Sequence, residues 1–364
     1  MRITSIAPAL AALLFLSPDP AVPQGIDGYA DTLRNRSGAP GVGIGWIIDG
    51  ASGINVAGVR ARNTDAAIGP QDLWHIGSNA KAMTATLVAR LVEAGVLRWD
   101  DTIGQSLGDL DPHPDYRDVT LQMLLAHRGG LPANLGPLAR RGLSGRLAER
   151  EMIADRRSYA RSVLEGAPVS RPGTEFLYSN AGYVVAGAMI EAATGQTWET
   201  LIEAWVFEPL DIQTAGFGAP GNAQTLSQPR GHGGTFPWSR GAVAPGPDAD
   251  NIPAMGPAGT VHLSLRDHLR FLNAHLTRRG GFLSAESWEK LQSDVADQGY
   301  ALGWVVRDDG ALAHAGSNTL WFNIALIDRT RGLALVLALN DGALSRVRPA
   351  SEAVLAAILA QQPD

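Results

Sequence analysis

The chain has 364 residues, of which 45% are hydrophobic and 18% charged, so it can bury a large core and extended disorder is excluded. Its formal net charge of -6 lacks the basic surplus that nucleic-acid phosphates require, and with no cysteine it has no disulfide, thiol nucleophile or cysteine-ligated metal. Three arginine pairs are interpreted as solvated surface: Arg140/Arg141, Arg156/Arg157 and Arg278/Arg279.

Residues 1–24 have the order of a secretory signal: an early cation at Arg2, an apolar run over 6–16, and then a proline-rich polar stretch. The run is about half the ~20 apolar residues that a membrane-spanning helix needs, so we expect no membrane span. The alternative is an amphipathic leader that stays attached to the chain. The favoured interpretation predicts a protein of bacterial type that is exported, either to the periplasm or out of the cell.

The first elements after the leader are a helix over 26–35 and two strands, 41–50 and 54–62, joined by a Gly/Ser turn. From about 79 to 290 the spacing of apolar residues is mostly helical. The stretch 216–262 is the most irregular connection, because it is rich in glycine and proline.

The C-terminal part repeats a pattern of strands and turns. Strands are expected within 300–310, 311–318, 321–332 and 333–341, and a closing helix over 351–360. We infer one α+β domain, 25–364, in which a mainly antiparallel sheet is built from both chain ends and flanked by helices. The sheet region is about 25–78 and 291–364, and a mostly helical region, about 79–290, is inserted in its middle. The groove between the two regions is expected to bind a small molecule or a peptide.

The stretch WHIGSNAKAMT (74–84) contains Lys81, and the chain has only one other lysine, Lys290. A helix is predicted to begin near Ser78, which places Ser78 and Lys81 on one face of its first turn. A buried lysine can lose its proton and become a base for a serine hydroxyl, whereas the pKa of arginine stays above about 12. The alternative is that Ser78 caps the helix and Lys81 lies on the surface, as we expect for Lys290.

Tyr178 and Asn180 lie two residues apart, just before a predicted helix. Side chains two apart on extended backbone point the same way, so both can reach one site. The Tyr178 hydroxyl would relay a proton, and the Asn180 amide would orient a substrate carbonyl or the lysine. A hydrogen-bonded core tyrosine and a turn asparagine are the alternatives.

His314, Gly316 and Ser317 lie at the end of a predicted strand. His314 and Gly316 would share one face, and Gly316 would let a substrate backbone come close. The backbone N–H of Ser317 could join that of Ser78 in binding an oxyanion. A structural histidine is the alternative.

Together these residues resemble the penicillin-recognising serine hydrolases, which include serine β-lactamases, D-Ala-D-Ala carboxypeptidases, D-amino-acid peptidases and esterases related to class C β-lactamases. That family carries S-x-x-K, then Y-x-N or S-x-N, then K/H/W-x-G. The corresponding residues are Ser78 to Lys81, Tyr178 to Asn180 and His314 to Gly316.

The resemblance implies that Ser78 is acylated and that Lys81 and Tyr178 share proton transfer, in an order that it leaves open. It further implies that Asn180 positions substrate and that His314 and Gly316 line the pocket. Typical β-lactamases have lysine at the position of His314, so a peptidase, carboxypeptidase or esterase acting on an amide or ester is favoured over an efficient β-lactamase. The alternative is a catalytically silent protein that binds cell-wall or D-peptide ligands. No cofactor is implied, and the spacing of His262, His268 and His275 gives no metal motif.

Overall fold

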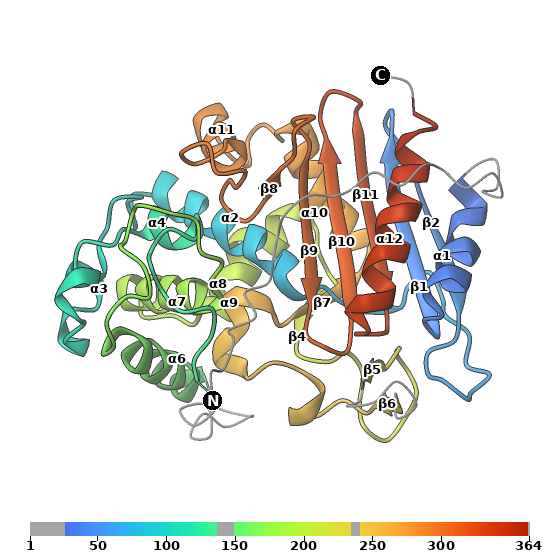
Figure 1. Ribbon diagram of the computed structural model, residues 1–364, viewed down its shortest axis with the longest axis horizontal. Helices are drawn as coiled ribbons and strands as arrows, with labels where there is room; N and C mark the ends of the chain where they lie inside the picture. Colours follow the sequence, from blue (N-terminus) through green and yellow to red (C-terminus); the bar gives the residue numbers. More distant parts are fainter. Residues whose placement is uncertain (1–25, 137–148, 234–240, 363–364) are drawn as a thin grey trace, which may run out of the picture.

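The computed structural model describes residues 26–136, 149–233 and 241–362, and Figure 1 shows its two regions, a sheet with terminal helices and a mainly helical part beside it. The predicted leader, 1–24, and the pair Arg140/Arg141 lie outside the described residues. None of the helices described there is long and apolar enough to cross a membrane.

The main sheet has six antiparallel strands in the order β2-β1-β11-β10-β9-β8. Its strands come from both ends of the chain, so the predicted α+β architecture is confirmed. The strands are β1 (Gly41–Ile48), β2 (Ala51–Gly58), β8 (Val305–Val306), β9 (Leu312–Ser317), β10 (Phe322–Asp328) and β11 (Leu333–Leu339).

Both faces of this sheet are covered, which explains the unbroken apolar run of β11. The four leucines at 333, 335, 337 and 339 pack in one core with α1 (Tyr29–Ser37) and α12 (Leu344–Leu359). Ala334, Val336 and Ala338 face the other way, into the core shared with α10 (Leu265–Thr277). Because side chains alternate along a strand, the large leucines of β11 all lie on one face of the sheet. The smaller residues lie on the other face, where α10 can pack closely.

The helical region is organised around α2, which lies between the sheet and the other helices (Figure 1). The sequence predicted that this helix begins near Ser78, and in the structure every residue from Ala80 to Ala89 is buried, on both faces of the helix. Alanines and threonines on the second face allow this, and the Thr84 hydroxyl donates to the carbonyl of Pro257. The helices of this region are α2 (Ala80–Glu93), α3 (Ile103–Ser106), α4 (Leu121–Leu125), α6 (Glu149–Leu164), α7 (Asn180–Thr194), α8 (Trp198–Ile202), α9 (Gly256–Gly259) and α11 (Ala285–Gln292).

Two small sheets were not predicted. One has the order β3-β7-β4, and the other pairs β5 with β6. Their strands are β3 (Leu73–His75), β4 (Gly216–Phe217), β5 (Gly231–Gly233), β6 (Gly241–Val243) and β7 (Val261–Ser264). Strands of two to four residues leave no periodic signal in a sequence.

The C-terminal elements differ from expectation at two places. The strand predicted within 300–310 is reduced to β8, because the chain turns at Gly303, where a Cβ would lie 2.5 Å from the Cα of Ala82. The closing helix, expected from 351, already begins at Leu344 and includes Pro349. Burial of Val347 and Val354 in the core offsets the hydrogen bond that the proline cannot donate.

Two predicted surface cations are not fully solvated. The guanidinium of Arg156 is buried and donates to Glu191 and Glu199, and to the carbonyl of Ala254. Lys290 is partly buried, with its Nζ 5.7 Å from the ring centroid of Trp99.

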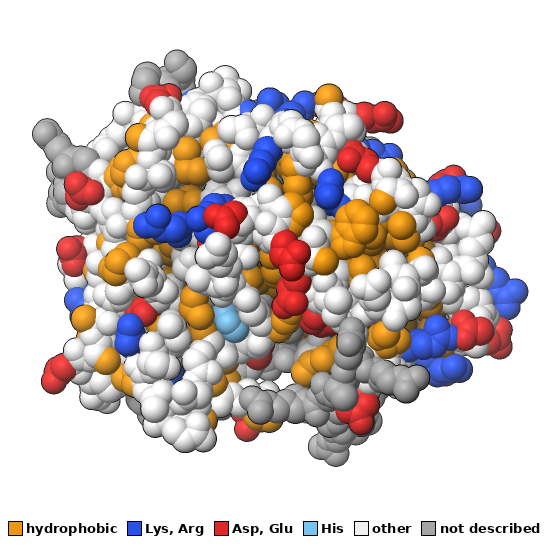
Figure 2. All heavy atoms as spheres, turned by 180° about the vertical axis from the view of Figure 1, so that it is seen from behind, with side chains coloured by type: hydrophobic (Ala, Val, Ile, Leu, Met, Phe, Trp, Pro, Cys, Tyr) orange, Lys and Arg blue, Asp and Glu red, His pale blue; other side chains and the backbone are white. Residues whose placement is uncertain are grey.

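The face of the molecule opposite to that of Figure 1 carries charges of both signs. Figure 2 shows acidic and basic side chains interspersed there, with no extended basic surface on that face.

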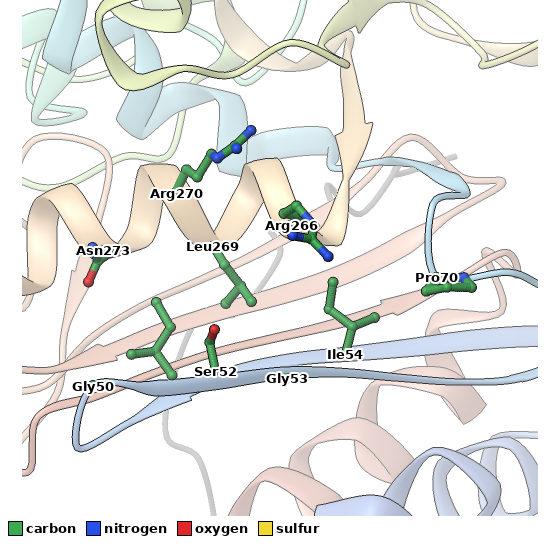
Figure 3. Close-up of a pocket in the computed structure, with 10 residues that line it drawn as sticks. Gly50, Ser52, Gly53, Ile54, Pro70, Arg266, Leu269, Arg270 and Asn273 are labelled. Carbon is green, nitrogen blue, oxygen red and sulfur yellow. The ribbon is translucent and has the colours of Figure 1, made fainter.

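A cavity of about 580 Å³ lies between the β1–β2 hairpin and α10 (Figure 3). Ile54, Arg266 and Leu269 are among the residues that line it, and none of the predicted site residues does.

Candidate active site

Ser78 lies in a tight turn that leads into α2. Residues Gly77–Asn79 form a 3-10 turn, and Gly77 has a φ of +53°, a conformation in which glycine is favoured. Ser78 does not cap the helix: α2 has Asn79 as its N-cap residue, and Asn79 instead donates its amide to Asn323 on β10 at 2.7 Å. The Ser78 hydroxyl therefore remains available to other partners.

The amine of Lys81 is buried beside this hydroxyl. Its Nζ lies 3.0 Å from the Oγ of Ser78, 2.7 Å from the Oδ1 of Asn180 and 2.7 Å from the carbonyl oxygen of Ala258. Burial lowers the pKa of Lys81 well below its ordinary value, because desolvation penalises the charged form. The surface alternative for Lys81 is excluded by these contacts.

Tyr178 completes the surroundings of Ser78. Its hydroxyl donates to the Ser78 Oγ at 2.8 Å, and its ring centroid lies 5.0 Å from the Nζ of Lys81. Burial raises the pKa of Tyr178 above its usual value, and the hydrogen bond to Ser78 opposes this shift. The side chain is therefore a neutral phenol at ordinary pH.

Asn180 is the first residue of α7, and Ser179 caps that helix by accepting from the N–H of Gly182. The Asn180 amide oxygen faces Lys81, while its Nδ2 donates to the Oδ1 of Asn134 at 3.0 Å. Of the two roles expected for this amide, orienting the lysine is the one that these contacts support.

The segment at the end of β9 contacts the turn that carries Ser78. His314 is buried, and its Nε2 shares a hydrogen bond with the hydroxyl of Tyr300 at 3.3 Å. Burial lowers the pKa of His314 to about 3, so the ring is neutral. At Gly316 the structure itself requires glycine, because a Cβ there would lie 2.0 Å from the Ile76 carbonyl oxygen and 2.8 Å from the N of Ser78. Its hydrogen lets β9 bring Ser317 against the turn.

Other contributors were missed from the sequence. His127 lies two residues beyond the end of the short helix α4, with a φ of +57°, and its ring centroid lies 4.3 Å from that of Tyr178. Its Nδ1 accepts the N–H of Ser179 at 3.1 Å. The carbonyl of Ala258 and the hydroxyl of Tyr300 are further additions. A backbone carbonyl carries no sequence signal, and an aromatic residue in a core resembles any other.

Metal ligation has no support in the part of the chain that the structure describes. In residues 26–136, 149–233 and 241–362, no group of three or more His, Asp or Glu side chains could hold a metal ion. His275 instead contacts the hydroxyl of Thr86 at 3.1 Å, and the Nδ1 of His262 lies 2.8 Å from the carbonyl oxygen of Gly218.

The fold and this group of residues define the class of protein: a serine hydrolase with the β-lactamase-like arrangement of a sheet and a helical region. The sequence profile of the family described as Beta-lactamase matches residues 26–359. The chain therefore belongs to the β-lactamase family, as the motifs of the sequence indicated.

Named relatives span several activities. Penicillin-binding protein 4 of Amycolatopsis lactamdurans is 28% identical over 338 residues, which cover 86% of this chain and 84% of that protein. Esterase EstB of Burkholderia gladioli is 28% identical over 333 residues, covering 78% of this chain and 81% of the esterase.

Solved structures agree on the fold. A penicillin-binding protein homologue from Pyrococcus abyssi, described as octameric, has a TM-score of 0.73 at 22% identity and covers 92% of this chain and 77% of that one. The D-amino acid amidase of Ochrobactrum anthropi SV3, in complex with D-phenylalanine, has the same TM-score and identity and covers 92% and 98%.

Proposed function

We propose that Ser78 is the nucleophile that attacks the carbonyl carbon of an amide or ester and becomes acylated. The observation that carries this proposal is the position of the Ser78 Oγ, 3.0 Å from the Lys81 amine and 2.8 Å from the Tyr178 phenol. A serine hydroxyl needs a base to become nucleophilic, and both candidate groups for proton transfer are within reach.

Lys81 is the base in this proposal. The Asn180 amide oxygen and the Ala258 carbonyl can only accept hydrogen bonds, so they take the two protons of a neutral amine, and its lone pair faces the Ser78 hydroxyl. The lowered pKa of Lys81 favours this neutral form. Tyr178 remains protonated, and it passes a proton from the site to the leaving nitrogen or oxygen.

The reaction then proceeds in two steps. The Ser78 oxygen bonds to the carbonyl carbon while its proton moves to Lys81, and the backbone N–H groups of Ser78 and Ser317 stabilise the resulting oxyanion. The amine or alcohol leaves with a proton, and water hydrolyses the acyl-serine ester to regenerate the hydroxyl.

The substrate class follows from His314. Since its pKa is about 3, it supplies no positive charge at neutral pH to hold a substrate carboxylate. We therefore favour amides and esters without a carboxylate beside the scissile bond, such as D-amino-acid amides, neutral peptides and short esters, over β-lactams. The esterase and the D-amino acid amidase among the relatives and neighbours are consistent with this choice.

Active-site labelling tests the proposal. Wild type and Ser78→Ala are incubated with a fluorophosphonate and with a labelled penicillin, and intact mass is measured. One adduct on wild type and none on the variant are expected. An unlabelled wild type, or equal labelling of the variant, would contradict acylation at Ser78. Ligand-induced thermal stabilisation without turnover would instead favour the silent binding protein.

A substrate panel tests the class. Nitrocefin, short-chain p-nitrophenyl esters and D-amino-acid amides are compared by kcat/KM. We expect the esters or the amides to exceed nitrocefin, and a preference for nitrocefin would contradict the inference from His314.

Export of the protein is also proposed, on the order of charge and hydropathy in residues 1–24. Expression of the full chain in a bacterial host, followed by fractionation and N-terminal mass determination, tests this. Retention of the intact leader in the cytoplasmic fraction would contradict it.

A further inference from the structure

The carboxylate of Asp250 lies where segments around Ser78 meet. Its Oδ1 is 2.7 Å from the Nε2 of His75 and accepts a hydrogen bond from the Nδ2 of Asn318 at 2.9 Å. The side chain of Asp250 is only 6% exposed and that of His75 is 0% exposed, so water competes little for these two close contacts. Asp250 thus connects the chain just before Ser78 with the chain just after Ser317.

His75 links Asp250 to the turn Gly77–Asn79, which carries Ser78. Its Nδ1 accepts the N–H of Gly77 at 3.1 Å, so the ring proton is on Nε2 and faces Asp250. Because both ring nitrogens are engaged, His75 is not a second base for Ser78. What it fixes is Gly77, whose hypothetical Cβ would lie 2.4 Å from the N of Ser317.

Asn318 links Asp250 to the segment that carries the backbone N–H of Ser317. Its Oδ1 accepts from the N–H groups of Leu320 at 3.2 Å and Trp321 at 3.1 Å, and its Nδ2 is bound to Asp250. With its amide held at both ends, Asn318 fixes the chain directly after Ser317.

A third segment is attached to the same place. The next residue, Asn251, donates its Nδ2 to the carbonyl of Gly259 at 2.9 Å. Gly259 follows Ala258, whose carbonyl accepts from Lys81, and a Cβ on Gly259 would lie 3.0 Å from the backbone of Gly77. The loop that carries Asp250 is therefore connected both to the acceptor of the Lys81 amine and to the turn that carries Ser78.

We propose that Asp250 is a positioning residue that, through His75 and Asn318, sets the separation of the backbone N–H groups of Ser78 and Ser317. This role rests on the proposed acyl-serine function. Oxyanion donors act only when they are held at hydrogen-bonding distance from the developing charge, and loss of one costs about 10²- to 10³-fold in kcat. A displaced donor should affect the transition state more than substrate binding.

The test compares Asp250→Ala, Asp250→Asn and wild type on the best ester of the panel. A boronic acid inhibitor is the second probe, because its tetrahedral adduct places an oxygen where the oxyanion forms. We expect Asp250→Ala to lower kcat by about 30- to 100-fold and to weaken the boronic acid by a similar factor, with KM changed by less than about threefold. Asp250→Asn should recover most of the loss, since its Oδ1 can still accept from His75 and Asn318.

Asp267→Ala is the matched control. Asp267 is also a buried carboxylate, and it accepts hydrogen bonds from Gln213, Thr214 and Arg270, outside the site. Asp267→Ala should lower the Tm. It should leave unchanged the ratio between the dissociation constant of the boronic acid and the KM of the ester. Equal effects of the two alanine variants on that ratio would overturn the positioning role.

A pair of variants at His75 serves where Asp250→Ala does not fold. Asn at this position can accept from Gly77 but is too short to reach Asp250, whereas Gln can reach Asp250 in the manner of Nε2. We expect His75→Gln to retain more kcat than His75→Asn, and equal kcat would overturn the proposal. A wild type without a fluorophosphonate adduct refutes the acyl-serine function itself, whereas equal acylation rates of wild type and Asp250→Ala refute only the role of Asp250.

Discussion

His314 and Tyr300 share a hydrogen bond of 3.3 Å between the imidazole Nε2 and the phenol oxygen, and both side chains are buried. Burial lowers the pKa of His314 and keeps the imidazole neutral, and this distinguishes the pocket from one with lysine at the same position. The nature of the side chain at 314 should therefore decide whether a charged substrate group is accepted.

Replacing His314 with lysine should shift selectivity towards substrates that carry a carboxylate near the scissile bond. A hydrogen bond between charged groups contributes about 1.5 to 3 kcal/mol, which corresponds to about 10- to 100-fold in the ratio of kcat/KM for the charged over the neutral substrate. The measurement compares a D-Ala-D-Ala peptide with its C-terminal amide. His314→Gln is the neutral control, and a shift as large in that variant would argue against a charge effect.

Lys81→Arg should lose at least about 10²-fold in kcat/KM although it keeps the positive charge. Arginine cannot present a lone pair to Ser78, and its larger head group does not fit the acceptors Asn180 and Ala258. Lys290→Arg is the matched control, because it changes the only other lysine, which lies over Trp99. Ester hydrolysis by both variants is measured; near-wild-type rates for Lys81→Arg would refute the general-base role.

The pH dependence of kcat/KM should show one rising limb. Lys81 is active when neutral, and burial lowers its pKa, so activity rises with pH and levels off well below the ordinary lysine value of 10.5. His314 contributes no limb between pH 5 and 9 because its pKa is about 3, and Tyr178, with its raised pKa, stays protonated throughout that range. If an active Lys81 variant kept the same rising limb in its pH profile of kcat/KM, the titrating group would be a residue other than Lys81.

The sequence predicts an element or contact well when the residues involved are close together in the chain, and poorly when they are far apart in it. The strands of the main sheet were visible because β10 and β11 are long apolar runs, and Ser78 and Lys81 were related by one helical turn. The Asp250–His75 contact had no such signal, since it joins residues 175 apart that no local period connects. The same holds for the Ala258 carbonyl, which becomes an acceptor for Lys81 only through tertiary packing.

Arg156 shows how composition misleads. A pair of arginines resembled solvated surface, yet Arg156 is buried between α6, α7 and α8, while Arg157 beside it is partly exposed and meets Asp109. Side chains at adjacent helix positions point in different directions, so one faces the core and the next the solvent.

Removal of Arg156 should therefore destabilise the helical region, whereas removal of Arg157 should not. Arg156→Ala leaves the carboxylates of Glu191 and Glu199 without their cation, and breaking a buried ion pair in this way costs about 3 to 5 kcal/mol. Arg157→Ala, the adjacent control, breaks a partly exposed pair, for which about 0 to 1 kcal/mol is typical. Urea unfolding followed by circular dichroism measures both free energies. Equal losses in the two variants would show that the buried network contributes no more than a surface pair. Arg156→Met separates charge from packing, because an apolar side chain of similar length fills the space but leaves the two carboxylates unpaired, so it should remain well below wild type in stability.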